Sequence, residues 1–280
     1  MKKITLSANA KINLSLDVFQ KQNNYHPLSS FVCSLSLCDT ITLTKRNDHR
    51  ISIKTLGIPV GCSKRDNNAT LAAQQFMKKF EVVGVDITIT KNIPVGGGLG
   101  GSSADIVGVL KGLKALFEIK DDITPLANAM GSDCAYMLEG GFAKMEGRGE
   151  IVTKIPTDRK LYFIIISEDM GISAKECYAE FDKINRPSLP CTDRAIDLFL
   201  KGDDQFYSCI KNDLFESSLS LLPVLQDNID ALKNAGAQAS LMTGSGSSVY
   251  GVFSDKRLRD NAYKKLKKAY GDRLIKTESV

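Results

Sequence analysis

The chain has 280 residues, of which 43% are hydrophobic and 25% are charged, and its formal net charge is +5. This balance is that of an ordinary globular protein, and it excludes extensive disorder. The longest apolar run, residues 161–166, is far shorter than the roughly 20 residues that a membrane-spanning helix needs. No apolar stretch follows Lys2 and Lys3, so we expect a cytoplasmic protein with no signal peptide and no membrane partner.

The cysteine and histidine content excludes several kinds of site. The seven cysteines form no Cys-x-x-Cys pair, and the chain has two histidines. We therefore expect reduced thiols and no zinc site built on clustered histidines. The positive charge gathers in residues 255–280, where apolar side chains recur at the helical positions 258, 262, 266 and 269. This pattern predicts a solvated amphipathic helix, and we expect no nucleic-acid partner.

The first half of the chain has the alternating pattern of β-strands. In residues 10–18 every even position is apolar and every odd position is polar. This pattern predicts a strand that buries one face and presents the other. The presented face carries Lys11, Asn13, Ser15 and Asp17. Further strands are expected at 40–44, 51–53 and 85–90, and helices at 70–80 and 103–117.

The second half of the chain mixes strands and helices. Strands are expected at 161–166, 239–242 and 248–253, and helices at 174–184, 195–200, 224–234 and 257–270. Because these elements do not alternate regularly, the pattern favours an α+β fold over a doubly wound parallel sheet. A boundary near residues 154–160 predicts an N-terminal domain of residues 1–155 and a C-terminal domain of residues 156–280.

A glycine-rich loop stands between the strand at 85–90 and the helix at 103–117. Such a loop lets the backbone approach a ligand closely, and the free amides of the following helix form a site for phosphate. Ser102 and Ser103 can cap that helix or donate to phosphate. The residues expected to hold a nucleotide phosphate are Pro94, Gly96, Gly97, Gly98, Leu99, Gly100, Gly101, Ser102, Ser103 and Ala104.

Other classes of glycine loop fit less well. The spacing Gly-x-Gly-x-x-Gly matches the dinucleotide fingerprint, but no strand ending in an acidic residue follows at the required distance. The chain has no Gly-Lys-Ser/Thr of a Walker loop and none of the protein-kinase motifs. A Rossmann-type oxidoreductase is therefore disfavoured, as is a flexible linker, which seldom leads straight into a well-patterned helix.

Three segments resemble the three motifs of the GHMP kinase superfamily, in the right order and across nearly the whole chain. They are residues 10–14 (Ala-Lys-Ile-Asn-Leu), the loop 94–104 and residues 241–249 (Leu-Met-Thr-Gly-Ser-Gly-Ser-Ser-Val). The resemblance implies a two-domain α+β fold, with a mixed α/β N-terminal domain of ribosomal-protein-like type and a ferredoxin-like C-terminal domain. It also implies an ATP-dependent kinase that uses Mg²⁺.

Within this superfamily the chain resembles the kinases that phosphorylate a cytidine-diphosphate-linked polyol, diphosphocytidyl-methylerythritol, on the non-mevalonate route to isoprenoids. The segments that carry this likeness are Tyr25-His26, Gly131-Ser132-Asp133 and Gly147-Arg148-Gly149-Glu150. The resemblance implies that Asp133 is the catalytic base and that Lys11 orients it. It implies that Asn13 holds the polyol and that Tyr25, His26 and Tyr178 contact the cytosine. It further implies that Thr243, Gly244, Ser245 and Gly246 close the phosphate site.

The sequence departs from that pattern at Asn24, where glycine is usual, at Cys134-Ala135, where Val-Pro is usual, and at Ala174, where threonine is usual. These positions bear on the acceptor rather than on the nucleotide. The alternatives are another GHMP kinase, of homoserine or mevalonate type, and a catalytically silent ligand sensor on the same fold. A monomer or a homodimer is expected.

Overall fold

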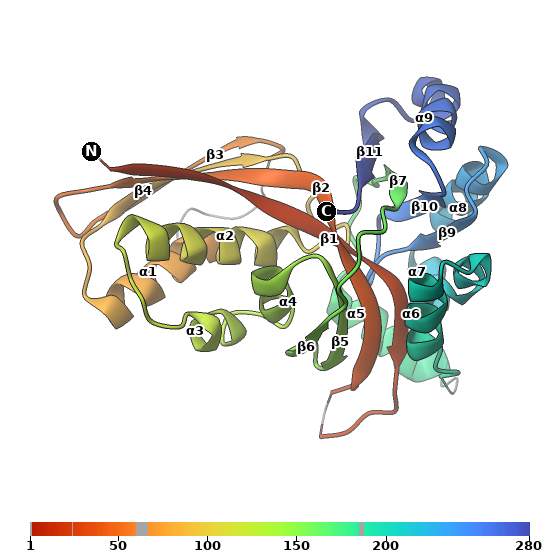
Figure 1. Ribbon diagram of the computed structural model, residues 1–280, viewed down its shortest axis with the longest axis horizontal. Coiled ribbons are helices and arrows are strands. Elements are labelled where there is room, and N and C mark those ends of the chain that lie inside the picture. Colours follow the sequence, from red (N-terminus) through yellow and green to blue (C-terminus); the bar gives the residue numbers. More distant parts are fainter. Residues whose placement is uncertain (1, 24, 60–66, 185–187) are drawn as a thin grey trace. The chain divides into compact units, whose positions relative to one another are not determined.

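The computed structural model describes residues 2–23, 25–59, 67–184 and 188–280 (Figure 1). The first elements are β1 (Lys3–Val18), β2 (Leu28–Lys45), β3 (Ile51–Gly57), α1 (Asn68–Phe80), β4 (Val85–Lys91), α2 (Gly101–Leu116), α3 (Thr124–Asn128), α4 (Cys134–Glu139), β5 (Phe142–Gly147) and β6 (Ile151–Lys154). The chain continues with β7 (Tyr162–Ile166), α5 (Ala174–Ile184), α6 (Thr192–Lys201), η1 (Asp204–Cys209), β8 (Lys211–Asn212), α7 (Phe215–Leu221), α8 (Val224–Asn234), β9 (Ala239–Met242), β10 (Val249–Phe253), α9 (Lys256–Tyr270), η2 (Gly271–Arg273) and β11 (Leu274–Glu278). Among the residues described, no helix is both long and apolar enough to cross a lipid bilayer.

The strands and helices that periodicity predicts are confirmed. They correspond to β1, β2, β3, β4, β7, β9 and β10 and to α1, α2, α5, α6, α8 and α9. Some are longer than predicted, because β1 begins at Lys3 and α6 begins at Thr192. The prediction misses the first half of β2 and the shorter elements β5, β6, β8, β11, α3, α4 and α7.

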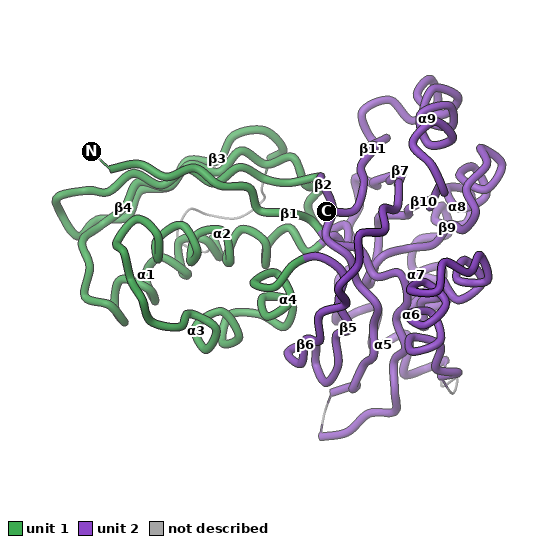
Figure 2. The backbone as a smooth tube through the Cα atoms, in the orientation of Figure 1, with its two compact units in different colours: residues 1–10, 37–95, 100–140 green, residues 11–36, 96–99, 141–280 purple. Residues whose placement is uncertain are grey.

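The chain forms two compact units, each assembled from separate stretches (Figure 2). Unit 1 contains Met1–Ala10, Leu37–Val95 and Gly100–Gly140, and unit 2 contains Lys11–Ser36, Gly96–Leu99 and Gly141–Val280. Strands β1 and β2 run through both units. Because the stretches are interleaved, the expected division into residues 1–155 and 156–280 does not follow these units and stays a prediction.

In unit 1, α1 and α2 lie along one face of a sheet (Figure 1). Strand β4 pairs with residues 40–45 of β2 in antiparallel fashion and with β3 in parallel. Helix α2 approaches the sheet closely through two glycines. A side-chain carbon on Gly108 would lie 2.9 Å from Ile41, and one on Gly112 would lie 2.6 Å from Leu43. Glycine at these two positions therefore sets the distance between α2 and the strands.

Unit 2 contains a four-stranded antiparallel sheet in the order β11-β7-β10-β9. Ile165 of β7 lies between Tyr250 of β10 and Ile275 of β11. Helices α8 and α9 cover this sheet, and their apolar side chains, such as Leu232 and Ala262, join its core. When β7, β9, β10 and β11 are numbered 1 to 4 along the chain, their order in the sheet is 4-1-3-2. This order confirms the expected ferredoxin-like arrangement. In the same unit β5 pairs with β2 and β6, and β8 pairs with β1.

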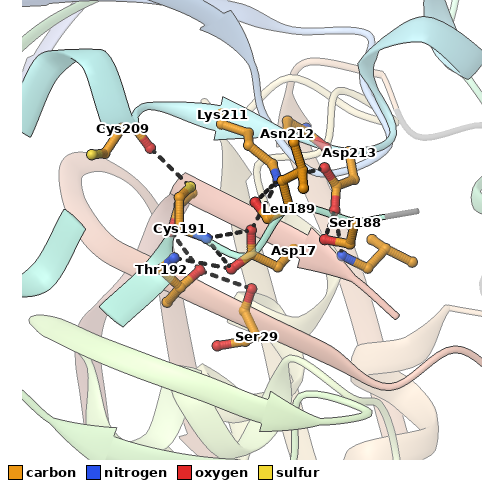
Figure 3. Close-up of polar contacts among 12 residues, drawn as sticks. Asp17, Ser29, Ser188, Leu189, Cys191, Thr192, Cys209, Lys211, Asn212 and Asp213 are labelled. Carbon is orange, nitrogen blue, oxygen red and sulfur yellow. Dashed lines mark hydrogen bonds and ion pairs between the residues drawn. The ribbon is translucent and has the colours of Figure 1, made fainter. Parts of the chain in front are cut away.

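The prediction that β1 presents one face is wrong, because both faces are buried from residue 11 onward. Asp17 and Ser15 are fully buried, although they belong to the polar set. The Asp17 carboxylate accepts hydrogen bonds from the N–H groups of Cys191 (3.1 Å) and Thr192 (2.9 Å), as Figure 3 shows. It also pairs with Lys211 at 3.3 Å. Residues about 175 positions away in the sequence thus cover this face.

Asp17 also caps a helix to which it does not belong. The N-cap residue of α6 is Cys191, whose side chain makes no capping hydrogen bond. The carboxylate of Asp17 satisfies two amides at that helix terminus instead, and its negative charge meets the positive end of the helix dipole. The end of β1 and the start of α6 are thereby fixed to each other inside unit 2.

Candidate active site

Lys11 and Asn13 lie side by side on β1, and both are 5% exposed. The Lys11 ammonium donates a hydrogen bond to the Asn13 side-chain oxygen (2.7 Å). The Asn13 amide group in turn donates to the Ser30 hydroxyl (2.7 Å), which fixes the orientation of the amide. The Asn13 backbone N–H donates to the Thr243 hydroxyl (3.1 Å). The first and third sequence motifs therefore meet in unit 2.

The middle of the glycine loop joins the same place in unit 2. The carbonyl of Gly97 accepts a hydrogen bond from Ser248 N–H (3.1 Å), and that of Leu99 accepts one from Lys11 N–H (2.9 Å). A side-chain carbon on Gly98 would lie 2.2 Å from the Thr243 carbonyl oxygen. Glycine is therefore required at this close approach, and residues 96–99 pack directly on the Thr243–Ser248 loop.

The loop backbone has the shape of an anion site. Gly96, Gly98 and Gly100 have φ of 72°, 74° and 74°, values that side-chain-bearing L-residues rarely adopt. Left-handed residues that alternate with ordinary ones turn successive N–H groups toward one side, which makes a concave nest for anions. The geometry supports the expected phosphate-binding role of this loop, which stays a prediction for each residue.

Helix α2 begins directly after the loop. Its N-cap is Gly100, so no side chain caps the first turn. Of the two roles expected for Ser102 and Ser103, helix capping is therefore wrong. The Ser102 hydroxyl accepts a hydrogen bond from the Asn68 side chain (2.6 Å). An uncapped first turn with the positive end of the helix dipole is the usual anion site of a helix.

Asp133 stands in unit 1 at the N-cap position of α4, but its carboxylate makes no capping hydrogen bond there. The next residue, Cys134, is fully buried. Burial raises the pKa of the Cys134 thiol to about 11, and a hydrogen bond with Ser103 opposes that rise. The thiol is therefore protonated at neutral pH. The contact with Ser103 brings the segment of Asp133 beside the start of α2 within unit 1.

Tyr178 and His26 come together in unit 2. The His26 ring stacks on Tyr178 of α5, with 5.6 Å between ring centroids and an interplanar angle of 25°. Its Nδ1 lies 2.8 Å from the Phe19 carbonyl oxygen, and its Nε2 lies at ion-pair distance, 2.8 Å, from Asp182. Asn24, which precedes Tyr25-His26 in the sequence, lies outside the described residues. Ala174 is the first residue of α5.

The sequence predicts no role for Arg148, although this residue lies in the Gly-Arg-Gly-Glu segment that carries the family likeness. The Arg148 guanidinium lies over the Tyr25 ring, 3.9 Å from its centroid. Sequence reasoning also missed Tyr250, whose hydroxyl donates to the Asn13 carbonyl (2.8 Å). Lys11 belongs to unit 2 and Asp133 to unit 1, so their joint action stays a prediction.

Comparison with known proteins decides the family. Residues 67–143 match the model of the GHMP kinases N terminal domain, and residues 195–272 match that of the GHMP kinases C terminal domain. The chain belongs to the GHMP kinase family. It is an ATP-dependent small-molecule kinase, with the two-domain α+β fold of that family.

Similar proteins carry one name in particular. A protein from Bacillus cereus named 4-diphosphocytidyl-2-C-methyl-D-erythritol kinase is 35% identical over 263 residues, which cover 91% of this chain and 90% of the relative. One of the same name from Acetivibrio thermocellus is 33% identical and covers 95% of this chain and 96% of its own. A crystal structure of 4-(cytidine 5'-diphospho)-2C-methyl-D-erythritol kinase superposes with a TM-score of 0.84 at 26% identity, covering 99% and 100% of the two chains. A homoserine kinase from Cytophaga hutchinsonii shares the fold, with a TM-score of 0.76 at 18% identity and coverage of 100% and 95%.

Proposed function

We propose that this kinase transfers the γ-phosphoryl group of ATP to the 2-hydroxyl of 4-diphosphocytidyl-2-C-methyl-D-erythritol, on the non-mevalonate route to isoprenoids. The observation that carries the proposal is the stacked pair of His26 and Tyr178 in unit 2, together with Tyr25, which adjoins His26 in the chain and lies under the Arg148 guanidinium. A pyrimidine is recognised by stacking on such rings and by a few hydrogen bonds to its edge. The relatives at 33–35% identity carry the matching name.

The phosphate end of the proposal rests on the loop 94–104. Phosphoryl transfer requires that the transferred group be held in line and that its charge be stabilised. Backbone amides of the alternating glycines and of the first turn of α2 supply that stabilisation. We assign to Thr243, Gly244, Ser245 and Gly246 the role of closing the phosphate site, since the glycine loop packs on them within unit 2.

At the acceptor substrate, the proposed mechanism needs a base beside the reacting hydroxyl. In the proposed reaction the acceptor oxygen forms a bond to the γ-phosphorus, the bond to the bridging oxygen of ADP breaks, and the proton passes to the Asp133 carboxylate. Lys11 orients that carboxylate and stabilises charge on the attacking oxygen. Asn13, held by Lys11 and Ser30, is oriented to bind a hydroxyl of the polyol.

We expect Mg²⁺ to enter the site bound to the phosphates of ATP. It prefers oxygen ligands and commonly keeps phosphate oxygens and waters. Within the described residues there is no cluster of three or more His, Cys, Asp or Glu side chains that could hold a metal ion. When bound to ATP, the ion neutralises phosphate charge, which the loop amides also offset.

The acceptor is tested by measuring ADP release with the purified protein and three candidate acceptors. We expect the highest kcat/KM with 4-diphosphocytidyl-2-C-methyl-D-erythritol, and little turnover with homoserine or mevalonate. Preference for homoserine or mevalonate would refute the acceptor while leaving the kinase assignment intact. If no ADP is released with any of the three acceptors, the result would favour the alternative of a ligand sensor.

The residue roles have separate tests. Asp133→Asn should lower turnover by a factor of about 10² to 10⁴ while ATP still binds, since the base is lost but the phosphate site is not. Near-normal turnover would remove the base assignment. His26→Ala should raise the KM of the acceptor more than that of ATP, and equal effects on both would contradict a role in cytosine binding.

A further inference from the structure

A buried cluster of charges in unit 1 has no part in the proposed reaction. Lys91, at the end of β4, is 5% exposed, Asp39 of β2 is fully buried, and Asp105 of α2 is 9% exposed. The Lys91 ammonium donates hydrogen bonds to Asp39 and to Asp105, the latter at 2.7 Å. Burying charged groups is unfavourable, and a buried ion pair is weak evidence for stability. The cluster therefore calls for another explanation.

The cluster binds the chain on both sides of the glycine loop. Before the loop, the second oxygen of Asp39 accepts hydrogen bonds from the N–H groups of Asn92 (2.6 Å) and Ile93 (2.9 Å). After the loop, Asp105 belongs to α2, one turn past its start. The ammonium of Lys91 also lies 3.5 Å from the position of a side-chain carbon on Gly101. One buried lysine thus joins the entry and the exit of residues 94–100.

The number of charges leaves one carboxyl group in excess. Lys91 supplies one positive charge, whereas Asp39 and Asp105 could supply two negative ones. Asp39 accepts hydrogen bonds from Lys91 and from two backbone N–H groups, so both of its oxygens have partners. The Oδ1 atom of Asp105 is buried and has no hydrogen-bond partner among the described residues. Asp105 is therefore the group that takes a proton.

The titration of Asp105 agrees with this geometry. Burial raises the pKa of Asp105 to about 7, and Lys91 on β4 opposes that rise while Asp39 on β2 adds to it. The protonated form makes the cluster neutral. The ionised form gives it a net charge of −1, close to the helix terminus where we place the phosphates of ATP.

We propose that Lys91, Asp39 and Asp105 are positioning residues that clamp the two ends of the glycine loop, and that the protonated clamp is the form that favours ATP. The proposal rests on the assignment of this loop to ATP. Ionisation of Asp105 opposes the triphosphate by charge repulsion, so the affinity for ATP falls as pH rises through neutrality. A purely structural cluster would affect folding stability and leave this dependence unchanged.

The test is the equilibrium affinity for MgATP of the wild type and of Asp105→Asn, measured between pH about 6 and about 8.5. The ratio of the two dissociation constants cancels the titration of ATP itself. We expect a ratio of variant to wild type that declines with pH, by about threefold to tenfold, as the wild type gains a charge that the variant lacks. Asp105→Ala, which also removes the charge, should give the same decline, so the test survives poor folding of either variant.

Two controls separate the possible failures. Asp86→Asn removes a carboxylate from β4 that is half-exposed and paired with Arg46, and its ratio should not vary with pH. A constant ratio for both Asp105 variants would overturn the clamp. If Gly98→Val weakens MgATP binding in the same experiment, the loop assignment stands even where the clamp fails. If Gly98→Val leaves the affinity unchanged, the loop assignment and the clamp are both overturned.

Discussion

Replacing Asp17 with alanine should destabilise unit 2 more than almost any other change of a single charged side chain. Asp17 is fully buried, and its carboxylate satisfies the backbone N–H groups of Cys191 and Thr192 at the start of α6. Alanine leaves both donors without the acceptor that the carboxylate supplies. The change also removes a negative charge from the positive end of a helix.

The magnitude follows from the contacts. Each buried N–H that loses its acceptor costs about 1–3 kcal/mol. The loss of the ion pair adds little, roughly 0–1 kcal/mol, because Lys211 is partly exposed and stays paired with Asp213 at 2.9 Å. The total is about 4 kcal/mol, a large part of the ~5–15 kcal/mol that stabilises a typical domain. Asp17→Asn keeps one acceptor oxygen and should lose about half as much.

Urea unfolding followed by far-ultraviolet circular dichroism measures this effect, since the chain has no tryptophan for a fluorescence signal. The matched control is Asp197→Ala, which removes an exposed carboxylate of α6 that pairs with Lys201 one turn on. The control should change the free energy of unfolding by about 0.5 kcal/mol or less. If Asp17→Ala shifts it no more than this control does, the carboxylate does not cap α6, and the account of the buried face of β1 fails.

Three further changes have defined outcomes. Gly98→Ala should weaken ATP binding by about tenfold or more, because φ of 74° is strained for alanine and its side chain meets the Thr243 carbonyl; unchanged affinity in a binding titration would contradict this. Arg148→Met should raise the KM of the acceptor about twofold to fivefold with the KM of ATP unchanged, since the cation over Tyr25 is lost; a rise for both substrates would point to general misfolding. The pKa of Asp105 is about 7 in the folded state against 3.8 in the unfolded chain, so between these values the folded state holds a proton that the unfolded chain has lost. The contribution of Asp105 to the free energy of unfolding therefore declines as pH rises from about 4 to about 7, and it is constant above that range. The melting temperature of Asp105→Asn relative to wild type should therefore increase over that range, and a constant difference would show that Asp105 is ionised throughout.

The sequence predicts the elements that have strong periodicity and one buried face. Helices α5 and α8 begin and end where their apolar stripes do. The first half of β2 escapes prediction because it is buried on both faces, so its mixture of serine and apolar residues has no alternation. Ser15 and Asp17 resemble surface residues in the sequence, and their partners include Thr192, which lies about 175 positions further along the chain.

The sequence predicts the motifs of the candidate site, but it does not predict the residues that hold those motifs in place. The approach of Gly98 to Thr243 follows from the family resemblance, which implies that both motifs face one phosphate site. Arg148 reaches Tyr25 through the pairing of β5 with β2, and no local pattern reveals that pairing. The charge cluster of Lys91 joins side chains from three elements, each of which reads alone as an ordinary polar residue.

The interleaving of the two units limits how this protein can be made and divided. Residues 1–10 belong to unit 1, the following stretch to unit 2, and the chain returns to unit 1 at residue 37. No single cut releases either unit intact, so truncated fragments should be unstable and prone to aggregation. During synthesis β1 leaves the ribosome long before its neighbour β8, and β7 waits for β11 to cover its edge. Unit 2 can therefore be completed only when the end of the chain has been synthesised, whereas every stretch of unit 1 is available once residue 140 has emerged.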